Sequence, residues 1–90
     1  MDVPVRVEAP HNGSRPSSQG RLQDLSFYGA YFVTPQQYEA EDPVEIVLPL
    51  GADKSDELRL CGYVLRVEPQ PASGKGWVGV AVQFPAPPRS

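Results

Sequence analysis

The residues best suited to chemistry stand together in one short stretch of the chain, from Asp24 to Gly29. Asp24 and Ser26 are two residues apart, and their carboxylate and hydroxyl groups can bond to nearby backbone N–H groups to form a tight polar corner. Gly29 can adopt a positive φ without a steric penalty, so we expect it to complete the corner in that conformation. An ordered corner with carboxylate and hydroxyl oxygens can also accept N–H groups from the edge of a ligand. This corner is therefore the candidate binding site.

Two strands must position the corner. The segment Gly20–Gln23 is expected to precede it as a strand, and Ala30–Thr34, which is aromatic and β-branched, to follow it as another. Further strand patterns run through Val3–Glu8, Val44–Leu50, Glu57–Val67 and Trp77–Phe84. Because no segment has a convincing helical period, the sequence predicts an all-β protein, a small antiparallel barrel of six strands.

The proline- and glycine-rich segments indicate where the strands are interrupted. Residues 9–19 are rich in Pro, Asn, Gly and Ser and are expected to form a mobile loop, and residues 85–90 to form a proline-rich tail. Gly62, in the middle of the longest strand pattern, indicates either a bulge or a close backbone approach. A chain of 90 residues is expected to form a single domain over residues 1–90.

Composition argues against several classes of function. The formal net charge of −3 without a basic run makes DNA, RNA and anionic membranes poor partners. A single cysteine, Cys61, excludes an internal disulfide and a cysteine-based zinc cluster. No metal motif, catalytic set or phosphate-binding loop is present, so we expect no enzyme activity, no metal and no cofactor. Without an apolar span or a signal-peptide pattern, a cytoplasmic location is expected.

The spacing Asp-x-Ser-x-x-Gly, present as Asp24-Leu25-Ser26-Phe27-Tyr28-Gly29, resembles the second signature motif of the PilZ family. The later strand patterns resemble the strands of that family in order and spacing, over nearly the whole chain. The resemblance implies a small bacterial β-barrel that serves as a receptor for cyclic di-GMP. It also implies that Asp24 and Ser26 read a guanine edge and that Gly29 allows close approach. Many members carry a C-terminal helix, which prolines at the density of residues 85–90 cannot form.

The chain departs from the family in its arginines. The first family motif, Arg-x-x-x-Arg, supplies phosphate and stacking contacts, and it occurs nowhere in this sequence. Arg15, Arg21 and Arg66 are the remaining candidates for those contacts, since the planar guanidinium pairs with phosphate and stacks on bases. Two functions stay open: a non-catalytic regulatory domain that binds cyclic di-GMP through the Asp24 corner, or a degenerate domain that binds a partner protein and no nucleotide. In the second case Asp24 and Ser26 only close a turn.

The positions of the large side chains, buried or exposed, would distinguish these two functions. Trp77, Tyr28, Tyr31 and Tyr63 are expected in the core or at the barrel mouth, as large amphipathic rings usually are. An exposed cluster of Phe27, Tyr28 and Trp77 would instead indicate a protein-binding patch. Cys61 is expected as a small buried side chain. Arg66 is expected on the face of Val64 and Gly62, unless a bulge shifts the register.

Overall fold

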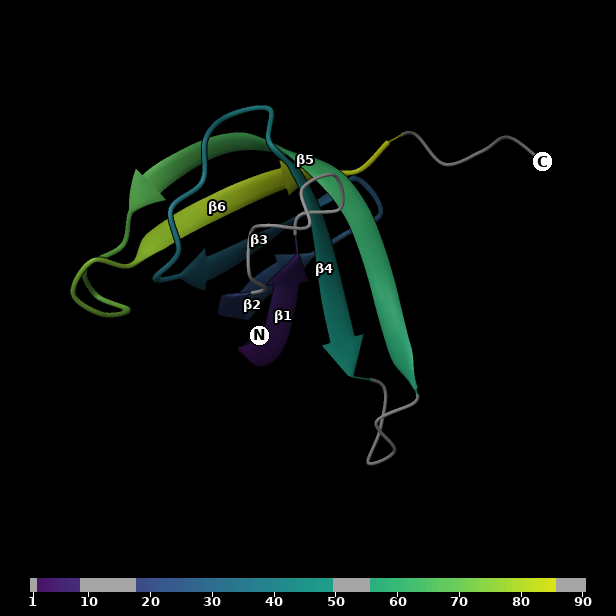
Figure 1. Cartoon of the computed structure of the whole chain (residues 1–90), viewed down its shortest axis with the longest axis horizontal. Coiled ribbons are helices and arrows are strands. Elements are labelled where there is room, and N and C mark those ends of the chain that lie inside the picture. Colours follow the sequence, from purple (N-terminus) through teal and green to yellow (C-terminus); the bar gives the residue numbers. More distant parts are fainter. Residues whose placement is uncertain (1, 9–17, 50–55, 86–90) are drawn as a thin grey trace.

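The computed structural model of the chain describes residues 2–8, 18–49 and 56–85 (Figure 1). These residues form six strands and no helix, so the described part contains no helix able to cross a membrane. The strands are β1 (Val3–Glu8), β2 (Ser18–Leu25), β3 (Gly29–Thr34), β4 (Pro43–Pro49), β5 (Glu57–Pro69) and β6 (Val78–Gln83). The all-β prediction is confirmed.

The strands close into a barrel in the order β1-β2-β3-β6-β5-β4, and β4 pairs back with β1. All six neighbouring pairs are antiparallel, so the predicted six-stranded antiparallel barrel is confirmed. Strand β2 begins at Ser18, two residues before its expected start at Gly20. The rest of the expected loop, residues 9–17, and most of the tail, residues 86–90, lie outside the described residues.

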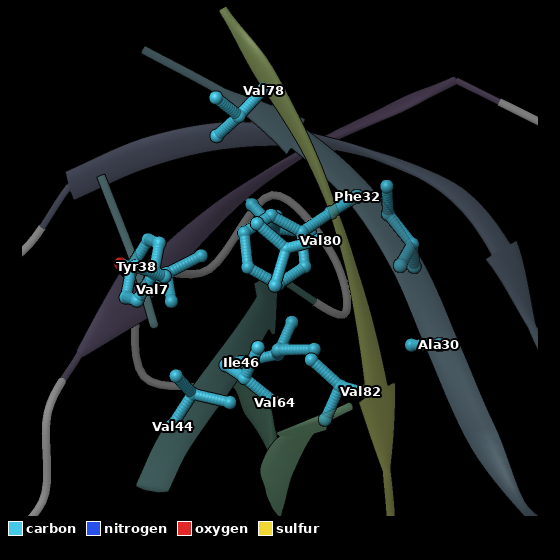
Figure 2. Packing of buried hydrophobic residues seen from close by; sticks show 12 residues of the cluster. Val7, Ala30, Phe32, Tyr38, Val44, Ile46, Val64, Val78, Val80 and Val82 are labelled. Carbon is cyan, nitrogen blue, oxygen red and sulfur yellow. The ribbon is translucent and has the colours of Figure 1, made fainter. Parts of the chain in front are cut away.

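Alternate residues of the strands point inward and fill the barrel with a single apolar core (Figure 2). The rings of Phe32 and Tyr38 meet edge to face, with centroids 6.0 Å apart. Tyr38 comes from the connection between β3 and β4. The buried members of the core are Val5, Val7, Leu22, Ala30, Phe32, Tyr38, Val44, Ile46, Val64, Val78, Val80 and Val82.

Two β-bulges change the direction in which side chains point. The pairing of β2 with β3 shifts between Leu22 and Asp24, and that of β5 with β6 shifts between Val64 and Arg66. Leu22 and Val64 are buried, whereas Asp24 and Arg66, two positions further along, are exposed. Since a shift of one residue moves the following side chains to the other face, the bulges place both polar residues outside the barrel. Arg66 therefore does not share the face of Val64, because a bulge shifts the register before it.

Two glycines allow strands to approach one another. The expectation of a positive φ at Gly29 is wrong, because Gly29 lies in the extended start of β3. Instead, a Cβ added there would lie 2.2 Å from the carbonyl oxygen of Val82. At Gly62 a Cβ would lie 2.5 Å from the carbonyl oxygen of Gln83, so the close approach expected there is confirmed.

Strands β4 and β5 continue together beyond the end of β6, toward the lower right of Figure 1. They pair from Pro43 with Tyr63 to Pro49 with Glu57, and β1 pairs with the other side of β4 from Glu45 to Val47. Strand β6 reaches only as far as Tyr63, which pairs with Gln83. The first part of β5 therefore has a neighbour on one side only among the described residues.

Candidate functional site

The Asp24 corner is a strand end followed by a tight turn. Asp24 lies in β2, and its Oδ1 accepts a hydrogen bond from the backbone N–H of Leu25 at 2.9 Å. The Ser26 backbone N–H donates to the Gly29 carbonyl at 2.9 Å, which closes the turn into β3. The Ser26 hydroxyl accepts from the Tyr28 N–H at 3.2 Å and donates to the Gly29 carbonyl at 3.4 Å. The corner is thus ordered by its own side chains.

The two candidate side chains differ in what they can still offer a ligand. Asp24 is exposed, and within the described residues its Oδ2 accepts no hydrogen bond. A carboxylate with one open oxygen can accept a charge-assisted N–H bond. The Ser26 hydroxyl already donates and accepts inside the turn, so it has less capacity left. Asp24 is therefore the stronger candidate for contact with a ligand.

The register of the strands aligns Asp24 with Arg66 across the outer face. Asp24 pairs with Tyr31, Tyr31 with Ala81, and Ala81 with Arg66. This row crosses β2, β3, β6 and β5, which puts the backbones of its two ends roughly 14 Å apart. Arg66 is exposed and forms no ion pair with another described residue. An open carboxylate and an open guanidinium therefore stand at opposite ends of one row.

Tyr31 lies between them as a fixed aromatic ring. Its hydroxyl donates to Glu68 Oε1 at 2.9 Å and accepts from Gln70 Nε2 at 2.7 Å. A Cβ added at Gly79 would lie 1.8 Å from that hydroxyl oxygen, so the ring extends across β6 where β6 has no side chain. Nothing in the spacing of Tyr31, Glu68 and Gln70 along the chain identified this arrangement, because the three meet only through strand pairing.

The Tyr31 hydroxyl is expected to ionise at higher pH than an ordinary phenol. Desolvation and the hydrogen bond to Glu68 raise its pKa, against the smaller opposing effects of Gln70 and Arg66. Because the folded pKa lies above the unfolded value, the stability that this group contributes is present below that value and lost as pH rises through the folded pKa. In an ultraviolet titration of tyrosinate absorbance, Tyr31→Phe should remove a component that ionises at higher pH than an ordinary phenol. A titration curve that keeps its full high-pH amplitude after the substitution contradicts the assignment.

Arg21 is placed near the corner, but it is already occupied. Its Nε and Nη2 donate to the two carboxylate oxygens of Asp2 at 2.8 and 2.9 Å. Gln23 Nε2 donates to Asp2 Oδ1 at 3.0 Å. The hydrogen bond from Arg21 lowers the pKa of Asp2, and the same bond raises the pKa of Arg21. Arg21 would have to leave Asp2 before it could bind a phosphate, and no sequence pattern predicted this ion pair. Arg15, the remaining candidate, lies outside the described residues.

The exposed aromatic residues gather at one end of the barrel. Phe27 is 88% exposed and Tyr28 77% exposed, at the tip of the turn. Trp77 is not part of this group, because it precedes the end of β6 that pairs with Thr34, whereas Gly29 pairs with the other end. Tyr63 is also exposed. Tyr28 and Tyr63 therefore do not lie in the core, and the three-residue cluster is reduced to Phe27 and Tyr28.

An apolar pocket opens beside these aromatic residues. It has a volume of about 420 Å³ and lies between the turn and the first part of β5. Leu25, Leu60 and Phe84 form the part that packs against the core, while Phe27 and Leu58 are exposed. Its lining is Leu25, Ser26, Phe27, Leu58, Leu60 and Phe84.

A separate charged cluster covers the outer face of β1, β4 and β5. Arg59 contacts Glu8 at 3.3 Å and Glu57 at 3.7 Å and also pairs with Glu45. Cys61 is exposed, so the expectation of a buried thiol is wrong: it lies on this outer face and its Sγ donates to Glu45 Oε2 at 3.3 Å. Partial desolvation and the Glu45 carboxylate raise the pKa of the Cys61 thiol. A thiol with a raised pKa is a poor nucleophile.

The fold and the corner together define a class of protein: a small closed antiparallel barrel with an Asp-Ser-Gly corner between its second and third strands. The PilZ domain family model matches residues 1–90, and the chain belongs to this family. No curated protein sequence matches the chain.

Proposed function

We propose that this chain is a non-catalytic PilZ-type regulatory domain that binds cyclic di-GMP on the outer face of β2, β3, β6 and β5 in the bacterial cytoplasm. The observation that carries the proposal is the aligned row from Asp24 through Tyr31 and Ala81 to Arg66. It joins a hydrogen-bond acceptor, an aromatic ring and a cation on one surface. These three features suit the donors, the flat bases and the phosphates of a guanine dinucleotide.

In this proposal each residue has a distinct part. The open carboxylate oxygen of Asp24 accepts N–H groups from a guanine edge, and Ser26 holds the turn that orients Asp24. Gly29 keeps the turn close to β6, because it has no Cβ beside the Val82 carbonyl. Arg66, whose charge already acts on the Tyr31 hydroxyl, supplies a phosphate or stacking contact. Arg21 and Arg15 are secondary candidates for the same contacts.

Calorimetric titration of cyclic di-GMP into the chain tests the proposal. Micromolar binding is expected, and Asp24→Ala should weaken it roughly 10- to 100-fold, since a hydrogen bond to a charged group is lost. Asp24 is exposed, so the variant should keep the stability of the parent chain.

Asp56→Ala, which also removes one negative charge from an exposed residue but lies outside the row from Asp24 to Arg66, is the matched control and should bind as the parent chain does. The absence of heat up to high-micromolar ligand, with the fold intact by circular dichroism, overturns the receptor proposal. Equal weakening by both substitutions would show that only overall charge matters.

Asp2 is expected to oppose nucleotide binding. It neutralises Arg21 through two hydrogen bonds and adds a negative charge beside the surface proposed for phosphates. Asp2→Asn removes the charge and weakens the bonds to Arg21, so it should tighten cyclic di-GMP binding a few-fold in the same titration. An unchanged or lower affinity contradicts a role for Arg21.

A second candidate function is that of a protein-binding adaptor. The observation that favours it is the solvent exposure of Phe27 and Tyr28 next to an apolar pocket. Exposed aromatic residues at the rim of an apolar pocket are common anchors in protein interfaces. The engagement of Arg21 by Asp2 favours the same function, because it removes one of the few arginines near the corner.

A further inference from the structure

One strand edge of the barrel is open beside the apolar pocket. From Glu57 to Gly62, β5 pairs with β4 on one side, and within residues 2–8, 18–49 and 56–85 no strand pairs with it on the other. Strand β6 stops opposite Tyr63, so this open edge continues directly from the end of β6 (Figure 1). Unpaired N–H and C=O groups along a strand edge are a template for one more strand.

The pocket lies where the side chains of such a strand would point. Leu58 and Leu60, which alternate along the open edge, line it together with Phe84 and the corner residues Leu25 and Phe27. In a strand laid in line with β6, every second side chain faces the interior side of the sheet. The volume of about 420 Å³ gives room for more than one apolar side chain. The backbone edge and the pocket therefore match a single extended segment.

The segment that follows β6 is poorly suited to continue as a strand along this edge. The backbone N–H of Phe84 donates to the carbonyl of Tyr28 at 2.9 Å, so the chain leaving β6 is bonded to the corner. The sequence beyond it contains Pro85, Pro87 and Pro88, which lack the N–H groups that a strand ladder requires.

Charge indicates what kind of segment fits. Asp24 directly precedes the lining residue Leu25, and Asp56 lies two residues before the lining residue Leu58. Both acids are exposed and have no cation partner among the described residues. Both the local acids and the net charge of −3 disfavour a second copy of this chain and favour a cationic segment. Lys or Arg side chains next to the apolar ones would complement these two acids.

We propose that the open edge of β5 from Glu57 to Gly62 docks an extended segment of a partner protein, which adds antiparallel to β5 in line with β6. The segment has alternating apolar side chains, a Lys or Arg beside them, and no proline. This mode of binding draws affinity from the backbone and specificity from alternate side chains. The inference deepens the adaptor function, on which it rests, and is independent of cyclic di-GMP binding.

Selection from a phage library of random short peptides against the immobilised chain provides the probe. The selected peptides are expected to share the alternating apolar and basic pattern, and a fluorescein-labelled copy to bind with a micromolar Kd by anisotropy. Methylation of the backbone nitrogens that face β5 should abolish binding. Methylation of the intervening nitrogens should leave it intact, because those groups point away from the edge.

Two leucine variants separate the pocket from general surface effects. Leu58→Asp, at a pocket residue that is 41% exposed, should weaken peptide binding about tenfold or more. Leu65→Asp, at a residue that is 55% exposed and outside the pocket, is the matched control and should bind as the parent chain does.

Each other outcome overturns the docking proposal in a recognisable way. Peptides that bind equally well to Leu58→Asp, or tolerate methylation at every position, leave the adaptor function standing but place its surface elsewhere. Failure to select any peptide contradicts both the docking proposal and the adaptor function. Sedimentation of the chain as a dimer that Leu58→Asp dissociates would show that a second copy occupies the edge.

Discussion

Replacement of Phe32 by alanine is expected to lower the free energy of unfolding by about 4 kcal/mol, because it empties the centre of the barrel. Phe32 is fully buried and meets the Tyr38 ring at an interplanar angle of 87°. A chain of this size has a stability of only about 5–13 kcal/mol, so the variant should unfold at much lower urea concentration than the parent. Urea denaturation followed by circular dichroism measures the difference.

The matched control for Phe32→Ala is Phe27→Ala, the same chemical change at a side chain that is 88% exposed. It should leave the unfolding midpoint nearly unchanged. If Phe32→Ala does not fold at all, Phe32→Leu keeps most of the side-chain volume and still tests whether this position is buried. It should lower the free energy of unfolding by about 1 kcal/mol. Equal effects of the two alanine substitutions would contradict the placement of Phe32 in the core.

Replacement of Gly29 by alanine is expected to lower the free energy of unfolding by about 3 kcal/mol. The added Cβ would lie 2.2 Å from the Val82 carbonyl oxygen, and that oxygen belongs to the backbone of β6, which cannot rotate away. Strands β3 and β6 must then separate where Gly29 pairs with Gln83. Urea denaturation gives the loss of stability, and amide hydrogen exchange should show the opening first at this end of the β3–β6 pair.

Gly76→Ala distinguishes this cause from a general intolerance of glycine substitution. Gly76 has a φ of +79°, but a Cβ added there meets no atom within 4 Å. Gly76→Ala should therefore lower the free energy of unfolding only through backbone strain, by about 1 kcal/mol. A larger effect at Gly76 than at Gly29 would mean that conformation and not contact with β6 governs the role of glycine in this fold.

The strand pattern was readable from the sequence because it depends on local alternation. Val78, Val80 and Val82 alternate with smaller or polar residues, and all three are buried in the barrel as the period of two predicts. The polar corner was also readable, since the bonds of Asp24 and Ser26 reach only one to three residues along the chain. Interactions of such short range are encoded in the spacing of residue types.

Features that depend on register were not readable. A bulge inserts a single residue, and two bulges decide that Asp24 and Arg66 point outward although Leu22 and Val64 point inward. The positive φ expected at Gly29 failed for a related reason. The requirement there comes from the carbonyl of Val82, which is remote in sequence, and not from the turn itself.

By itself, then, the sequence determined six strands and the polar corner, because alternation and turn chemistry act between near neighbours. Only the tertiary structure decided which groups the corner faces. It brought Tyr31 to Glu68 and Gln70, engaged Arg21 with Asp2, and left the β5 edge open beside the pocket. Each of these depends on how distant strands align when the barrel closes, and that alignment is set by the whole sheet.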